Sequence, residues 1–385
     1  MDNPLMLMVP GPTPVPEPVL LAMAKHPIAH RSDEFFQLMA EVTQNLNWLH
    51  QTQHDVLILA SSGTGAMEAG MINFLSPGDR VLVGCNGKFG DRWAELASKF
   101  GLQVDTITAE WGTPLDPEQF RDRLAADTDK TIKAVILTHS ETSTGVINDL
   151  ETINHYVKAH GEALIMVDAV TSLGSVQIPI DDWGLDVVVS ASQKGYMMPP
   201  GLGFVAVSPR AWRAYPTAKF PRFYLDLGKY QQDALKHSNP FTPPVNLFFA
   251  LQAALQMMQT EGLEGIFDRH QRLSQALRSG LQALGFRLFA PDHAASPTVT
   301  ALFPPDGIDA EAIRSVMKHR FKIMLAGGQD HLKGKILRIG HLGYVRDRDI
   351  LTALSALEAT LLELGHNTFT SGAGVTAAAK IITAH

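Results

Sequence analysis

The stretch DVLILASSGTGAMEAGMINFL, residues 55–75, contains the pattern that decides the fold. It begins with an apolar run typical of a buried strand, continues through a turn of small residues, and ends in a helical pattern. Similar units recur as far as about residue 207, with the apolar runs RVLVG, KAVILTH, EALIMVDAV, DVVVSAS and GFVAV. Near-continuous apolar strands separated by helices are typical of a mainly parallel sheet buried on both faces. We therefore expect an α/β fold.

Prolines and loops divide the chain into segments. The stretch VPGPTPVPEPV, residues 9–19, holds five prolines, which disfavour a helix and a central strand, so we expect an extended arm. Between about 216 and 245 the apolar pattern loosens, and a loop of that length indicates a functional segment. The C-terminal stretch is small and weakly patterned, which favours loose order. The expected organisation is an arm over 1–20, a large domain over 21–260, a smaller α/β domain over 261–365 and a tail over 366–385.

Composition limits the possible partners. The chain has 385 residues, 45% of them hydrophobic, and a net charge of −7 without a block of five like charges. We therefore expect neither nucleic acid nor a membrane surface as a partner, and small metabolites fit better. No apolar run reaches the roughly 18 residues of a membrane span, and the N-terminus lacks a basic leader, so we expect a cytoplasmic protein. The single cysteine, Cys85, excludes an internal disulfide and a cluster held by several thiolates of this chain.

The first candidate site feature is the turn LASSGTGAMEAG, residues 59–70. A helix that begins near Gly65 presents its N-terminus to an anion, and the hydroxyls of Ser62 and Thr64 are further donors. Glu68 stands where a dinucleotide fingerprint requires its third glycine, and no Gly-Lys-Ser/Thr follows as in a P-loop. A phosphate without an adenosine is therefore favoured, although the turn alone is equally compatible with a structural role.

A carboxylate and a lysine follow two later strands, at the sheet edge where open α/β folds bind ligands. Asp168 comes directly after ALIMV, where a desolvated carboxylate needs a partner. A protonated pyridine nitrogen is one such partner, and the alternatives are a helix N-cap or a structural ion pair. Lys194 follows the strand in DVVVSASQKGYMMPPG, so its amine is partly desolvated, as imine formation requires. An ordinary loop lysine is the alternative.

An arginine interrupts an apolar strand of the expected smaller domain. Arg338 lies in KILRIGHLG, and its planar guanidinium suits bidentate binding of a substrate carboxylate. Taken without the turn, the carboxylate and the lysine, an arginine within an apolar strand is explained equally well as a surface residue of a half-exposed strand. Together the four features predict a site that holds a ring, a phosphate and a carboxylate.

The motifs PGPTPVP, SSGTGAMEA, THSETSTGV, VDAVTSLG, SQKGYMMPPG and LRIGHLG resemble, in order and spacing and over nearly the whole chain, the class V aminotransferases of PLP fold type I. Within that family the chain is similar to the alanine:glyoxylate and serine:glyoxylate aminotransferases, and among these to a cyanobacterial group whose members often carry the label of a soluble hydrogenase subunit. The resemblance implies a seven-stranded sheet in the large domain, pyridoxal 5′-phosphate (PLP) as the cofactor, no metal, and a homodimer with shared active sites.

The resemblance also assigns roles to residues around the cofactor. It implies that Lys194 forms the Schiff base with PLP and that Asp168 binds the pyridine nitrogen. It implies that Phe89 stacks on one face of the ring, Val170 packs on the other, and Thr142 binds the phenolic oxygen. The residues implied to hold the phosphate are Ser62, Gly63, Thr64 and Gln193.

The remaining implied roles concern the substrate and the neighbouring subunit. Arg338 is expected to take the substrate carboxylate, with Thr142 and the backbone at Gly11 also near the substrate. Thr242 in NPFTPP is expected to reach the phosphate of the dimer partner. Relatives often have a tyrosine just before that threonine, whereas this chain has Asn239 near that place, so that contact to the phosphate is in question.

The activity implied is a ping-pong transfer of an amino group from a small amino acid, alanine or serine, to glyoxylate, which gives glycine and a 2-oxo acid. The alternatives are a 2-aminoethylphosphonate-type aminotransferase of the same class and a non-catalytic accessory subunit of a redox complex. A cysteine desulfurase shares the fold but needs a nucleophilic cysteine on a late loop, whereas Cys85 lies early, at a strand end.

Overall fold

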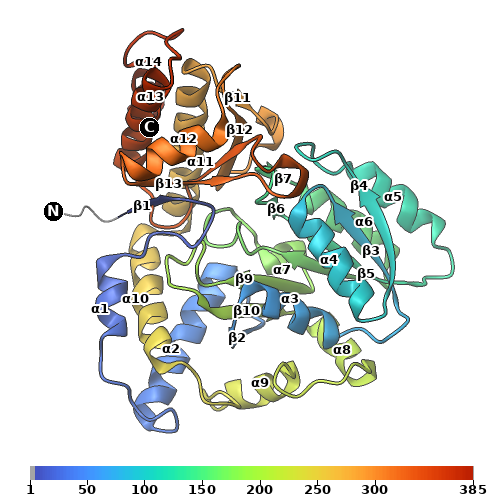
Figure 1. Ribbon diagram of the computed structural model, residues 1–385. Coiled ribbons are helices and arrows are strands. Elements are labelled where there is room, and N and C mark those ends of the chain that lie inside the picture. Colours follow the sequence, from blue (N-terminus) through green and yellow to red (C-terminus); the bar gives the residue numbers. More distant parts are fainter. Residues whose placement is uncertain (1–4, 385) are drawn as a thin grey trace.

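The computed structural model describes residues 5–384 (Figure 1). Its larger part is built on a seven-stranded sheet with the order β2-β10-β9-β8-β5-β3-β4. Only β10 reverses direction, because it pairs antiparallel with β9 and β2 whereas the pairs among the other strands are parallel. The expected mainly parallel seven-stranded sheet is confirmed. The strands are β2 (Asp55–Ser61), β3 (Arg80–Cys85), β4 (Gln103–Thr108), β5 (Ile132–Thr138), β8 (Leu164–Asp168), β9 (Val187–Ala191) and β10 (Gly201–Val207).

The continuous apolar runs form central strands because both faces of the sheet are covered. Along β8, Ile165 and Val167 belong to the core on one face, whereas Leu164 and Met166 belong to the core on the other. This alternation follows from the two-residue period of a strand. A run in which every residue is apolar is therefore satisfied only between two layers of helices.

Helices cover both faces of this sheet, and a small hairpin of β6 (Ser140–Glu141) and β7 (Val146–Ile147) lies beyond the end of β5. In residues 5–384 no helix is long and apolar enough to cross a membrane. The helices of this part are α1 (Glu17–Met23), α2 (Asp33–His50), α3 (Gly63–Ile72), α4 (Lys88–Lys99), α5 (Pro117–Ala126), α6 (Leu150–His160), α7 (Ile180–Trp183), α8 (Pro209–Ala214), η1 (Tyr215–Thr217), α9 (Leu227–Ala234) and α10 (Val245–Glu261).

A second sheet, of five strands in the order β1-β13-β14-β12-β11, lies in the C-terminal part of the molecule (Figure 1). Its core is separate from the two cores of the large sheet and includes Met8 from the N-terminus. The elements are β1 (Met6–Met8), α11 (Leu263–Ala283), β11 (Arg287–Leu288), η2 (Asp292–Ala294), β12 (Val299–Phe303), α12 (Ala310–His319), β13 (Ile323–Gly327), η3 (Asp330–Leu332), β14 (Leu337–Gly340), α13 (Asp347–Glu363) and α14 (Ala373–Ile382).

The N-terminal segment differs from the extended arm expected over residues 1–20, of which 1–4 lie outside the described residues. Strand β1 pairs in parallel with β13, and helix α1 already begins at Glu17. The prolines did not prevent this helix, because Pro16 is its N-cap and Pro18 lies in its first turn. Backbone nitrogens in the first turn of a helix have no acceptor within the helix, so a proline there removes no helical hydrogen bond.

The C-terminal tail is helical, so the expectation of loose order over 366–385 is wrong, with residue 385 outside the described part. Helix α14 packs on α11 and α13, and its Ala378 is fully buried. A Cβ atom added at Gly280 of α11 would lie 2.9 Å from the carbonyl oxygen of Gly374. The small residues that give the tail its weak apolar pattern therefore allow α14 to pack closely on α11.

The segment 216–245, expected to be a long loop, contains helix α9. Its aromatic residues form a cluster in which Phe241 contacts the rings of Phe223, Tyr224 and Tyr230. Tyr230 is buried, whereas Phe223 is 70% exposed. This segment therefore packs on the large domain through one side only.

Candidate active site

A cavity at the carboxyl ends of the parallel strands brings together nine of the predicted residues: Ser62, Gly63, Thr64, Phe89, Thr142, Asp168, Val170, Gln193 and Lys194. A second cavity, of about 800 Å³, is lined by Gly11 and Arg338 and shares Phe89, Thr142 and Lys194 with the first. The two cavities therefore meet at Lys194. Residues that follow five different strands of the large sheet line these cavities, as expected for a ligand site of an open α/β sheet.

Lys194 lies in the turn after β9 with its amine inside the protein. Its Nζ atom donates a hydrogen bond of 2.6 Å to the carbonyl oxygen of Pro10. Burial lowers the pKa of Lys194 to about 8, and the nearby charge of Arg338 acts in the same direction while Asp168 opposes it. A larger fraction of the amine is therefore neutral near physiological pH than for an ordinary lysine, which favours nucleophilic chemistry.

Asp168 is the last residue of β8 and is almost completely buried. Both carboxylate oxygens are held by neutral donors, because Oδ1 accepts from the backbone N–H of Val170 at 2.9 Å and Oδ2 from the indole N–H of Trp93 at 3.2 Å. The bond to Val170 lies within the turn that follows β8 and is not a helix cap, because the next helix begins only at Ile180. Desolvation raises the pKa of Asp168. A protonated pyridine nitrogen would supply the missing positive charge.

The N-terminus of α3 also lines the first cavity. Ser62 is the N-cap of this helix, and its Oγ accepts from the N–H of Gly65 at 3.3 Å. The Oε1 atom of Gln193 is buried without a hydrogen-bond partner among the described residues. Arg92, which sequence reasoning missed, donates from Nη1 to the Oγ1 atom of Thr64 at 3.4 Å. A helix N-terminus beside a guanidinium suits a phosphate.

Phe89 is positioned by a buried carboxylate that sequence reasoning also missed. Glu141 accepts from the backbone N–H groups of Phe89 at 3.0 Å and Gly90 at 3.1 Å through Oε2. Its Oε1 accepts from the N–H and the hydroxyl of Ser143 at 3.1 and 2.6 Å. Glu141 therefore anchors the first turn of α4, which carries Phe89. The sequence did offer one signal for Glu141, because this residue lies just after the apolar strand β5, in THSETSTGV.

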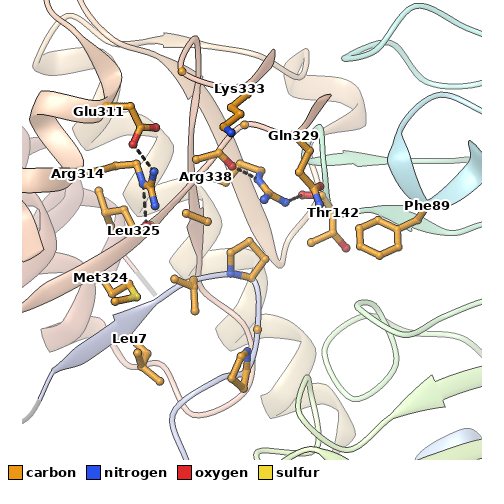
Figure 2. Close-up of a pocket in the computed structure, with 18 of the residues that line it drawn as sticks. Leu7, Phe89, Thr142, Glu311, Arg314, Met324, Leu325, Gln329, Lys333 and Arg338 are labelled. Atoms are coloured by element: carbon orange, nitrogen blue, oxygen red, sulfur yellow. Dashed lines mark hydrogen bonds and ion pairs between the residues drawn. The ribbon is translucent and has the colours of Figure 1, made fainter. Parts of the chain in front are cut away.

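Arg338 extends from β14 of the second sheet toward the large domain. Its Nη1 donates to the carbonyl oxygen of Thr142 at 3.1 Å and its Nε to that of Gly327 at 2.9 Å (Figure 2). The hydroxyl of Thr142 shares a hydrogen bond of 2.6 Å with that of Thr171. The Nη2 edge of Arg338 has no protein acceptor among the described hydrogen bonds. It is therefore the part of the guanidinium free to bind a carboxylate.

Two of the residues considered from the sequence lie away from these cavities. Thr242 is exposed and lines neither cavity of this chain. Asn239 is buried and donates from Nδ2 to the carbonyl oxygen of Ile58 at 3.2 Å. Its amide therefore supports β2 rather than the cavity.

The residues of the first cavity fit the cofactor that the resemblance implies. The lining combines the buried carboxylate of Asp168 with the N-terminus of α3, and it includes Phe89 and Val170 as apolar residues that could face a ring. Lys194 belongs to the same lining, so its amine is within the site. PLP requires this combination of a charged nitrogen partner, a phosphate site and an amine.

Comparison with known proteins agrees with this geometry. The family described as aminotransferase class-V matches residues 6–346. The protein named "Soluble hydrogenase, small subunit" from Synechococcus sp. (strain PCC 6716) is 67% identical, with 99% of each chain covered. A serine–glyoxylate aminotransferase from Methylorubrum extorquens is 35% identical over 98% of this chain and 95% of its own. The crystal structure of an alanine–glyoxylate aminotransferase from Nostoc sp. superposes with a TM-score of 0.88 at 34% identity, covering 94% of this chain and 96% of the other. The chain belongs to the class V aminotransferases, whose cofactor is PLP.

Proposed function

We propose that this aminotransferase moves the amino group of alanine or serine to glyoxylate, giving glycine and a 2-oxo acid. The observation that carries the proposal is the meeting of two cavities at Lys194, one suited to PLP and one containing Arg338. The carboxylate group common to all these substrates requires one cation beside the reacting amine, and the free edge of Arg338 supplies it.

Their shared place in one cavity supports the following roles for the residues that would hold the cofactor. Lys194 would bind PLP covalently as a Schiff base, and Asp168 would bind the ring nitrogen. Phe89 and Val170 would enclose the ring, with Thr142 at its phenolic oxygen. Bound PLP supplies an electron sink that lets the proton leave the α-carbon of the substrate. The phosphate would lie at Ser62, Gly63, Thr64 and Gln193.

Proton transfer is assigned to Lys194. Once a substrate amine has displaced Lys194 from the cofactor, the free Nζ atom would accept the proton from the substrate α-carbon and would then donate it to the cofactor. A pKa of about 8 suits this double role, because the amine gains and loses a proton readily near neutral pH. The carbonyl oxygen of Pro10, which accepts from Nζ, gives the released amine a fixed position.

The same proposal includes a homodimer with shared sites. Thr242 is exposed at the surface and lines neither of the two cavities described above, as expected if it serves the partner's phosphate. Large apolar side chains on the same segment are also exposed, with Phe223 at 70% and Leu235 at 79%. Sedimentation of the purified chain tests the dimer, and Thr242→Ala is expected to weaken PLP binding. We also place the protein in the cytoplasm, with neither nucleic acid nor a membrane as a partner.

The decisive experiment is single turnover with the purified, PLP-loaded protein. Alanine, serine and glycine are mixed with it in turn, and loss of the visible absorbance of the bound cofactor is followed. Alanine and serine are expected to react and glyoxylate to restore the absorbance. The two donors should overlap, because one hydroxyl in a plain pocket changes discrimination by only about 1–3 kcal/mol. Reaction with 2-aminoethylphosphonate but with neither of these donors would replace the proposal by the phosphonate alternative.

A further inference from the structure

The cavity that contains Arg338 extends well beyond the place where alanine would bind. Its volume is about 800 Å³, within the range of pockets that hold much larger ligands than a three-carbon amino acid. Figure 2 shows Phe89 at one end of this pocket, Glu311 and Arg314 at the other, and Arg338 between them. The far end is therefore open to a group at the distal end of a longer substrate.

That far end carries a second guanidinium. Arg314 lies on α12, where its Nε donates to the carbonyl oxygen of Leu325 at 3.2 Å and its Nη1 to Oε2 of Glu311 at 2.5 Å. A Cβ atom added at Gly327 would lie 3.0 Å from Nη1 of Arg314, and the carbonyl oxygen of Gly327 accepts from Arg338. Arg314 and Arg338 thus approach the same residue of β13.

The charges that line the pocket are unbalanced. Apart from Lys194, whose amine PLP would occupy, three basic side chains (Arg314, Lys333 and Arg338) and a single acidic one, Glu311, line the pocket. The charge of Arg314 reaches Arg338, because it contributes to lowering the pKa of Arg338 to about 10, although burial is the larger cause. Such a pocket attracts anions and favours a ligand with more than one negative group.

The partner of Arg314 is easily displaced. The side chains of Glu311 and Arg314 are 49% and 34% exposed, and they belong to one helix at positions i and i+3. Exposed ion pairs of this kind contribute little to stability. A carboxylate of a ligand can therefore take the place of Glu311 on the guanidinium without disturbing the fold.

We propose that the pocket also accepts dicarboxylic amino acids such as aspartate, with Arg338 on the α-carboxylate and Arg314 on the distal carboxylate. Glu311 occupies Arg314 when the donor has only one carboxylate and gives way when a second is present. This inference rests on the proposed transamination but concerns only the choice of donor.

The test compares aspartate with alanine in the amino-donor half-reaction of the PLP-loaded protein. Arg314→Gln is expected to lower the ratio of kcat/KM for aspartate to that for alanine by about tenfold or more, the effect of losing one charged hydrogen bond. Glu311→Gln is expected to raise the ratio, because the internal competitor is removed. The matched control is Arg121→Gln, which breaks the similar i, i+3 pair with Glu118 on α5 and should leave the ratio unchanged.

A binding measurement separates this inference from the proposed activity. Succinate and propionate differ by one carboxylate and have no amino group, so calorimetry reports their affinity even if neither amino acid is a donor. The wild-type protein is expected to bind succinate more tightly, and Arg314→Gln is expected to abolish the difference. The inference is wrong if succinate and propionate bind equally to the wild-type protein, or if Arg314→Gln leaves both the succinate preference and the donor ratio intact.

Discussion

The Nζ atom of Lys194 lies 2.6 Å from the carbonyl oxygen of Pro10, a residue 184 positions earlier in the chain. The backbone N–H of Thr13 also donates to the carbonyl oxygen of Gln193 at 3.1 Å, and the hydroxyl of Thr13 to that of Lys194 at 3.1 Å. The N-terminal segment therefore forms a wall of the active site, and its backbone fixes the turn that carries the lysine.

The first prediction concerns Gly11 in that wall. A Cβ atom there would lie 2.6 Å from Nζ and 2.8 Å from Cε of Lys194, so Gly11→Ala must displace the lysine. PLP incorporation is expected to slow and its affinity to fall. Gly101→Ala is the control, because Gly101 also has a positive φ but no atom within 4 Å of the added carbon. Backbone strain there is expected to cost about 1–2 kcal/mol of stability without affecting PLP uptake. Equal rates of uptake in both variants and the wild type would contradict the proposed contact.

The second prediction is a pH dependence. The neutral form of Lys194 is the one that attacks the aldehyde of PLP, and its pKa of about 8 lies well below the ordinary value of 10.5. The rate of PLP uptake by the apoprotein should therefore rise with pH up to about 8 and level off above it. Arg338→Gln removes a charge that lowers this pKa, so the midpoint should move upward. Uptake rates measured by absorbance between about pH 6 and 10 check both statements, and a rate still rising at pH 10 in the wild type would refute the first.

The third prediction concerns the substrate carboxylate. Arg338→Ala should weaken both half-reactions, because a hydrogen bond to a charged group is worth about 1.5–3 kcal/mol, or roughly 10- to 150-fold in kcat/KM. Arg338→Lys keeps the charge but not the planar fork, so it should restore only part of the loss. Single-turnover rates with alanine and with glyoxylate provide the measurement. Unchanged rates in Arg338→Ala would remove Arg338 from the proposed site.

The fourth prediction concerns Glu141, a positioning residue for Phe89. Glu141→Gln places an amide where the carboxylate accepts four hydrogen bonds, so one buried donor or more loses its acceptor. We expect a loss of about 2–3 kcal/mol in the free energy of unfolding together with weaker PLP binding. Ser143→Ala removes a hydroxyl that donates to Glu141 and accepts from the backbone N–H of Lys88 at 2.9 Å, so it should cost about 1–3 kcal/mol while Glu141 keeps its bonds to Phe89 and Gly90. Denaturant unfolding and PLP titration separate the two effects. Unchanged PLP affinity in Glu141→Gln would show that Glu141 does not position Phe89.

Some features were accessible from the sequence because the physics involved is local. The alternation of apolar runs and helices predicts the sheet, since a strand buried on both faces must be apolar throughout. Asp168 and Lys194 were found for a related reason. Each follows a buried strand, and the carboxyl ends of parallel strands lie at one edge of the sheet.

Other features required the tertiary structure, because their partners lie far away in the chain. The sequence around Glu141 does not indicate that it binds the backbone of Phe89, and the pair Glu311–Arg314 has the pattern of an ordinary exposed helix face. The pairing of β1 with β13 joins residues more than 300 positions apart. A three-residue strand carries too little local signal to predict such a contact.

The sequence by itself predicted the strands of the large sheet in their order along the chain, and it singled out an amine, a carboxylate and a turn of small residues as candidate site features. These depend on the burial of each segment and on the direction of the chain. Only the tertiary structure decided that Pro10 meets Lys194, that Arg338 reaches Thr142, and that Arg314 lines the same cavity as Arg338. Each of these contacts depends on how the two sheets pack against each other, and packing is a property of distant surfaces rather than of local sequence.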